Sequence, residues 1–354
     1  MILQGIKVLE LASVLAGPSV GMFFAELGAT VIKIENPSTH GDMTRSWKLP
    51  EEDPQSNISA YFASVNWGKQ HLFIDLKSPE GKKQVYQLAA DSDIVISNYK
   101  PGDDKKLGMD YATLSKLKPN IIYGHLTGYG DEDDRAAFDV VLQAETGYMS
   151  SNGFSGGEPL KLPLAMIDIL GAHQLKEGLV LALWQREKTG KGAYVTASLL
   201  AAAVSALSNL ACNWLMAGRI AKPIGNHHAT ITPYGELLTT ADGKKTVLAV
   251  GTDKQFTHLC EVLGRPELAL DPHYQSNHDR VCHRDELMAV LEPLAQQFTR
   301  EALLAKLYAL KVPAGPVLNM QEVFAIPAIA AMVLEEEVDG ILTKRPATVG
   351  FSIQ

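Results

Sequence analysis

The sequence predicts an α/β protein with two domains, a Rossmann-like open parallel sheet and a smaller α+β domain. Short β-branched runs alternate with helix-length segments from residue 6 to residue 124, and connections of that length join parallel strands. The chain has 354 residues, more than one hydrophobic core usually serves. After a polar loop at 225–234 the pattern changes to two strands joined by a turn and then several helices, which indicates the second domain.

The strands of the first domain are predicted from their alternating or continuous apolar residues. They are Ile6–Leu11, Thr30–Glu35, His71–Leu76, Ile94–Ser97 and Ile121–Gly124. Helices are predicted between them at Pro18–Leu27, Ser78–Ala90 and Tyr111–Lys118. No Gly-x-Gly-x-x-Gly follows the first strand, so the dinucleotide fingerprint is absent. The Gly17-Pro18 turn still offers free backbone N–H groups to a negatively polarised ligand at a helix start.

The second half begins with a predicted helix at 168–186 and an Ala/Ser-rich helix at 196–218. The latter carries no charge from 197 to 217, a length that suits a membrane span. Asn209 and Asn213 lower its hydrophobicity, so a buried or interface helix is favoured over a membrane helix. The predicted domains are 1–220 for the large domain, 221–310 for the small domain, and 311–354 for a segment that returns to the large domain.

The composition is typical of a soluble globular protein, with 46% hydrophobic and 20% charged residues. A net charge of −8 argues against nucleic acid as a partner, because phosphate binding needs a basic face. The three cysteines are far apart and odd in number, which indicates reduced thiols in a cytoplasmic protein rather than disulfides or a zinc site. We therefore expect no metal and no membrane partner.

Three motifs carry a family resemblance that covers nearly the whole chain. They are 5–18 (GIKVLELASVLAGP), 138–147 (FDVVLQAETG) and 153–159 (GFSGGEP). Together they resemble the family III CoA-transferases of the CaiB/BaiF type, which include formyl-CoA and carnitine CoA-transferases and acyl-CoA racemases. The resemblance implies a Rossmann-like domain built from both chain ends, a smaller domain, and an interlocked homodimer. It also implies coenzyme A and acyl-CoA as substrates, small carboxylic acids as partners, and no permanently bound cofactor.

The resemblance also implies where the nucleophile lies. In the transferases an Asp in a Gly-x-x-Asp-Gly-x-Pro turn attacks the thioester, and Gly156 occupies that place here. Only Asp or Glu serves, because the acyl intermediate must be both reactive and reversible. Glu158, two residues further along the same turn, is the first candidate to replace it.

Three other carboxylates are candidates near these motifs. Asp139 is expected to orient the turn or cap the following helix. Glu145 is expected to lie on a helix surface or to support the residues that touch the substrate. Asp168 aligns with the acid that racemases use, although a helix N-cap also explains an Asp at this position.

By the same resemblance, a set of residues after the strands is expected to bind coenzyme A. These are Val14, Leu15, Asn36, Asn66, Lys69, Asn98, Tyr99, Lys100 and Lys106. Solvated surface lysines are the alternative interpretation of the basic members.

Three functions stay open from the sequence. The first is a CoA-transferase with an unusual nucleophile, and the second is a racemase, isomerase or lyase that acts on acyl-CoA. The racemase needs a His directly before Asp139, where this chain has Phe138. The third is a homologue that binds CoA without turnover. Serine-hydrolase and His-Glu-x-x-His metal motifs are absent from the sequence.

Overall fold

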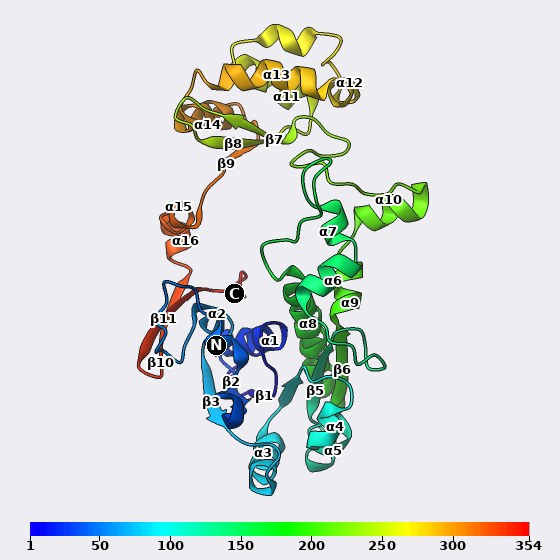
Figure 1. The fold of residues 1–354 in the computed structure, drawn as a ribbon, viewed down its shortest axis with the longest axis vertical. Coiled ribbons are helices and arrows are strands. Elements are labelled where there is room, and N and C mark those ends of the chain that lie inside the picture. The colour runs from blue at the N-terminus through cyan, green and yellow to red at the C-terminus, as the bar shows by residue number, and fades with distance from the viewer. Residues whose placement is uncertain (354) are drawn as a thin grey trace. The chain divides into compact units, whose positions relative to one another are not determined.

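The computed structural model describes residues 1–353 and divides into two compact units (Figure 1). The first unit comprises Met1–Met149, Lys161–Ile220 and Ala331–Gln354, and the second comprises Ser150–Leu160 and Ala221–Ala330. The predicted return to the large domain at residue 311 is therefore placed too early. The reason is that β9 (Ala314–Pro316) pairs with β8 (Lys245–Ala249) inside the second unit.

The first unit is built on a six-stranded parallel sheet with the order β3-β2-β1-β4-β5-β6. The strands are β1 (Lys7–Glu10), β2 (Thr30–Glu35), β3 (Lys69–Phe73), β4 (Ile94–Ser97), β5 (Ile122–Thr127) and β6 (Ala193–Ser198). This is the strand order of doubly wound folds, in which the order reverses between β1 and β4 and ligands bind beyond the carboxyl ends of the strands. The predicted parallel sheet is thus confirmed.

Helices cover both faces of this sheet. On one face α1 (Ala16–Glu26) and α8 (Met166–Thr189) pack together over β1, β4 and β5, with Val20, Phe24 and Leu175 buried between them. On the other face lie α3 (Pro79–Asp91) and α5 (Tyr111–Leu117). Shorter helices are α2 (Ala60–Ala63), α4 (Asp103–Leu107), α6 (Asp139–Glu145) and α7 (Tyr148–Ser151).

The C-terminal segment completes the first unit, as the resemblance implied. It forms an antiparallel hairpin of β10 (Val333–Val338) and β11 (Ile341–Pro346). The Arg345 guanidinium pairs with the buried carboxylate of Glu26 at the end of α1, which also accepts the Thr348 N–H at 3.1 Å. Residues from the two ends of the chain therefore share one folded unit.

The Ala/Ser-rich segment is not the single helix that the sequence predicted. Residues 193–198 are the edge strand β6, and they lead into α9 (Leu199–Ser205) and α10 (Asn209–Ala217), which are bent by 73°. Ser198 caps α9 by accepting the Ala201 N–H at 3.1 Å, and Ser208 breaks the path with a φ of 48°. Within residues 1–353, no single helix has the length and hydropathy to cross a bilayer. Of the described helices, only α9 and α10 taken together, despite the bend between them, reach that length and hydropathy.

The second unit is the smaller α+β fold. Its antiparallel sheet has the order β7-β8-β9, with β7 at Tyr234–Thr239. Its helices are α11 (Asp253–Val262), α12 (Asn277–Cys282), α13 (Arg284–Ala295), α14 (Arg300–Ala309), α15 (Met320–Phe324) and α16 (Pro327–Ala330). Leu238, Leu248 and Phe256 are fully or almost fully buried in its own separate core.

Candidate functional site

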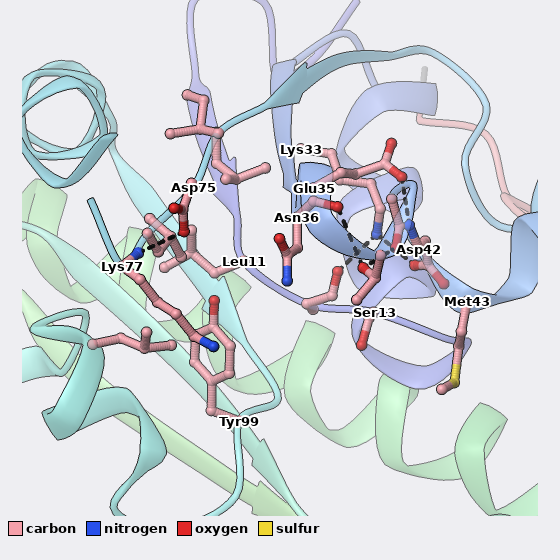
Figure 2. A pocket seen from close by; sticks show the side chains of 17 residues that line it. Leu11, Ser13, Lys33, Glu35, Asn36, Asp42, Met43, Asp75, Lys77 and Tyr99 are labelled. Atoms are coloured by element: carbon pink, nitrogen blue, oxygen red, sulfur yellow. Dashed lines mark hydrogen bonds and ion pairs between the residues drawn. The ribbon is translucent and has the colours of Figure 1, made fainter. Parts of the chain in front are cut away.

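A cavity of about 320 Å³ opens at the carboxyl ends of β1, β2 and β3 (Figure 2). Asn36 and Ser13 border it from the loops after β2 and β1, while Tyr99 and Lys77 border it from the loops after β4 and β3. Figure 2 shows Lys33, Glu35 and Asp42 clustered on one side of this cavity, with Lys77 and Tyr99 on the other. We call it the first pocket.

The charged side of the first pocket is held by a buried ion network. Lys33 Nζ lies 2.9 Å from Glu10 Oε1 and 3.0 Å from Asp42 Oδ2, and all three side chains are almost fully buried. Arg45 donates to both oxygens of Glu35 at 2.7 and 2.6 Å. Burial alone would raise the pKa of Glu35, but hydrogen bonds from Arg45 and His71 outweigh it and hold that pKa well below its ordinary range. The loop between β2 and α2 is thereby fixed.

This network also positions the backbone that starts α1. Both carboxylate oxygens of Asp42 accept the Val14 N–H, at 3.1 and 3.3 Å. Val14 has a φ of 73°, which is a strained conformation for a β-branched residue and is characteristic of functional sites. Asn98 clamps the adjoining peptide, since it accepts the Ser13 N–H at 3.0 Å and donates to the Ser13 carbonyl at 2.8 Å.

The first turn of α1 is closely packed and has no side-chain cap. A Cβ at Gly17 would lie 2.4 Å from that of Ala12, so only glycine fits there. An uncapped helix start presents backbone N–H groups and the positive end of the helix dipole.

A second pocket of about 100 Å³ faces that helix start. Val14, Leu15, Asn98, Phe138 and Asp168 are among its lining residues, and it shares Ser13 with the first pocket. The two pockets therefore adjoin along the loop after β1.

Asp168 is the titratable group of the second pocket. It is the third residue of α8, whose N-cap position is Ala165, so the interpretation of Asp168 as an N-cap is wrong. Asp139 supplies the cap instead, because its Oδ1 accepts the N–H groups of Ile167 at 2.6 Å and Asp168 at 3.4 Å. Gln143 steadies the other oxygen of Asp139 at 2.5 Å.

Burial first and the Asp139 charge second raise the pKa of Asp168 from 3.8 to about 7. A partly buried carboxylate of this kind, beside an uncapped helix start, is suited to nucleophilic or acid–base chemistry on a polarised carbonyl.

The family is decided by comparison with known proteins. The family model described as CoA-transferase family III matches residues 3–350. This chain belongs to that family. A succinate–glutarate CoA-transferase from Agrobacterium fabrum is 37% identical over 343 residues, which cover 95% of this chain and 85% of that protein. Human succinyl-CoA:glutarate CoA-transferase is also 37% identical, over 95% of this chain and 76% of its own length.

A solved structure gives the same answer. A CAIB/BAIF family protein from Brucella suis is 37% identical to this chain, with a TM-score of 0.87 over 99% of this chain and 92% of that one. The α/β fold class and the membership of the CaiB/BaiF type are therefore confirmed for this family III CoA-transferase.

The structure brings together five of the residues expected to bind CoA. Asn36 and Tyr99 line the first pocket, and Val14, Leu15 and Asn98 line the second. Lys100 and Lys106 are exposed near α4, where Lys106 pairs with Asp103 at 2.8 Å.

Two of the residues expected to bind CoA, Asn66 and Lys69, are instead buried inside the first unit of this CoA-transferase. The fully buried Lys69 Nζ contacts Glu10 Oε1 at 3.0 Å, the Pro18 carbonyl at 2.9 Å and Asn66 Oδ1 at 3.0 Å. Burial lowers the pKa of Lys69 to about 8. Neither side chain lines the two pockets, because Lys69 joins β3 to β1 and α1 from inside and Asn66 contacts Lys69 and the Phe62 carbonyl.

Sequence reasoning missed Lys77 in the first pocket. The signal was present, since Lys77 lies four residues after the end of β3, at the carboxyl edge of the sheet.

The turn that carries Gly156 and Glu158 belongs to the second unit. Glu158 is exposed there. Gly156 has a φ of 74°, and a Cβ at this position would meet nothing within 4 Å. Glu145 is exposed on α6, as expected.

Proposed function

We propose that this chain transfers coenzyme A from an acyl-CoA to a small carboxylic acid, with Asp168 as the nucleophile. The observation that carries the proposal is the position of Asp168, a partly buried carboxylate that lines a pocket facing the uncapped start of α1. Burial and the Asp139 charge, which raise the pKa of Asp168 to about 7, agree with this role. Asp168 replaces Glu158 as our first candidate. The function needs no substitute for Gly156, because the carboxylate is supplied from α8.

The adjoining pockets suggest how CoA lies on the first unit. Its adenosine end fits the larger first pocket, between Asn36 and Tyr99. Lys77 lines that pocket, and the exposed Lys100 and Lys106 follow β4, so these three cations are our candidates to bind its phosphates. The pantetheine arm then passes Ser13 and brings the thioester to Asp168 in the second pocket.

The chemistry proceeds by two exchanges. A carboxylate oxygen of Asp168 attacks the acyl carbonyl carbon, the C–S bond breaks, and CoA leaves as thiolate. The thiolate then attacks the Asp168 carbonyl of the mixed anhydride, which forms an enzyme thioester and releases the donor acid as its carboxylate. The acceptor carboxylate repeats both steps in reverse, so the reaction is neutral in protons and electrons.

The start of α1 stabilises the oxyanion in each step. Its first-turn N–H groups and helix dipole lie where negative charge develops beside Asp168. The strained Val14 and the Asp42 and Asn98 clamps hold these donors in place before substrate arrives.

For the substrate, we propose a dicarboxylic acid and its CoA thioester. The relatives at 37% identity are named for succinate and glutarate, which supports this class. The racemase alternative loses support, because the apolar ring of Phe138 lines the pocket where the partner base would be needed.

Intact-mass measurement after incubation with succinyl-CoA tests the nucleophile. Wild type and Glu158→Gln should both carry a CoA adduct, and Asp168→Asn should carry none. An adduct that persists in Asp168→Asn and disappears in Glu158→Gln would overturn the assignment and restore Glu158. No adduct on any of the three, with CoA binding intact, would favour the homologue without turnover.

We also propose a homodimer in the cytoplasm. Trp214, Leu215 and Met216 on α10 are 55%, 78% and 87% exposed, an apolar surface that supports burial against a second copy. All three cysteines are free thiols, which suits a reducing compartment.

A further inference from the structure

Three potential metal ligands gather on the second unit, whereas Asp168 belongs to the first. His273 lies in the loop before α12, His283 joins α12 to α13, and Glu286 follows one turn later on α13. One ligand atom from each of the three lies within 4.8 Å of those of the other two. Across residues 1–353, this is the one group of three or more such side chains that gathers so closely.

One of the two imidazoles is already oriented. His283 Nδ1 donates to the Asp279 carbonyl at 2.9 Å, which leaves its Nε2 with a free lone pair. Metal-bound histidines are held by a second hydrogen bond of this type. The His273 ring stacks on the His283 ring with 4.3 Å between centroids and 1° between planes, and His273 Nδ1 lies 3.9 Å from Glu286 Oε2.

The backbone beneath the three side chains is fixed by a buried arginine. Arg280 is fully buried, and its guanidinium donates to the Tyr274 and Thr232 carbonyls, both at 2.9 Å. It thus joins the His273 loop to α12. A metal site needs such a rigid support, because loosely held ligands pay conformational entropy on binding.

A neighbouring arginine fixes the loop that carries another histidine. Arg284 NH2 donates to the His228 carbonyl at 2.6 Å and holds that loop against the start of α13. His227, on the same loop, lines a surface cavity of about 390 Å³ together with His283 and Glu286.

We propose that His273, His283 and Glu286 bind a divalent transition-metal ion of the Zn²⁺ class. Two imidazoles and a carboxylate are a donor set that zinc accepts, with a water or His227 in the fourth position. Tetrahedral coordination needs ligand atoms roughly 3.3 Å apart. His273 and Glu286 are exposed and the His283 ring is partly so. Binding requires the His273 ring to rotate out of its parallel stack, until its lone pair and that of His283 point to the same ion. Mg²⁺ and Ca²⁺ are disfavoured, because they prefer all-oxygen ligands.

The sequence predicted no metal site because no His-Glu-x-x-His or paired-cysteine motif is present. The His-x-x-Glu spacing at 283–286 places both side chains on one helix face, and only the fold adds His273. The proposal does not depend on the CoA-transferase reaction.

Calorimetric titration of the full-length, tag-free chain with ZnCl₂ tests it. Wild type should bind one ion per chain, with MgCl₂ giving no heat. His273→Ala and Glu286→Gln change exposed side chains, so the fold should be kept while zinc affinity falls at least about tenfold. His278→Ala is the matched control, since His278 is exposed on α12 outside the trio and contacts Cys282 Sγ at 3.8 Å.

Co²⁺ provides an independent readout. Wild type should give the visible absorption of tetrahedral Co²⁺, and His273→Ala should lose it. Absence of zinc binding by wild type, or equal affinity in wild type and His273→Ala, would overturn the proposal. So would loss of binding in His278→Ala alone, which would place the ion at Cys282 and His278.

Discussion

Replacing Asp139 by Asn tests how the reactivity of Asp168 is set. The pKa of Asp168 rises from 3.8 to about 7, and burial is the larger cause and the Asp139 charge the smaller. The charge therefore accounts for less than half of the rise, at most about 1.6 pH units or roughly 2 kcal/mol. An Asn side-chain oxygen can still accept the Ile167 N–H, which keeps the cap of α8. The Asn amide nitrogen then faces the Gln143 amide that now donates to Asp139, so circular dichroism must show that the fold is kept.

The assay is the single-turnover rate of adduct formation with succinyl-CoA, measured by quench and intact mass from pH 5 to pH 9. The ionised carboxylate is the nucleophile, so the wild-type rate should rise with pH and reach half its maximum near pH 7. Asp139→Asn should move that midpoint to lower pH by up to about 1.6 units. Glu145→Gln is the control, because it removes the same charge from an exposed position on α6.

Two results would refute this reasoning. One is a wild-type midpoint below pH 5, which would mean that Asp168 is not perturbed. The other is a midpoint in Asp139→Asn that is unchanged or raised, which would mean that the Asp139 charge does not act on Asp168.

The remaining predictions concern stability, CoA affinity and assembly. A carboxyl group whose pKa is raised in the folded state lowers the stability of that state as pH rises from 3.8 to about 7. In scanning calorimetry, Asp168→Asn should therefore raise the melting temperature at pH 8 and leave it unchanged at pH 3.8 or below. A lower melting temperature at pH 8 would contradict this. Lys77→Ala should weaken CoA binding about tenfold in calorimetry, because Lys77 lines the first pocket. Lys83→Ala, at an exposed position on α3, is the control and should leave the affinity unchanged. Equal losses of affinity in both variants would indicate a non-specific effect of charge. Leu215→Glu with Met216→Glu should convert the dimer into a monomer by light scattering, and a wild-type monomer at micromolar concentration would remove the basis of that expectation.

The sheet was predictable from the sequence because its strands are short β-branched runs whose burial is set locally. All four residues of β4 are buried, which matches the continuous apolar run at 94–96. The break at Ser208 was not predictable, since a positive φ leaves no pattern in an Ala/Ser-rich stretch.

The site depended on contacts that are distant in sequence. Asp168 was a candidate from the resemblance, but its perturbed pKa arises from burial and from Asp139 on another helix. Lys69 was expected at a ligand from the resemblance, and only the fold reveals the buried Glu10 that holds it. Residues 314–316 belong to the second unit because they pair with β8, and no local sequence pattern indicates that pairing.

The central claim is that Asp168 carries the covalent intermediate, and peptide mapping tests it most directly. Wild type is incubated with succinyl-CoA, reduced with borohydride and digested with trypsin, which releases residues 162–176 and 136–161 as separate peptides. Asp168 is the only acidic residue in 162–176, whereas 136–161 contains Asp139, Glu145 and Glu158. The account predicts reduction of a carboxyl to an alcohol in 162–176 and an unmodified 136–161. Modification of 136–161 with an unmodified 162–176 would contradict it.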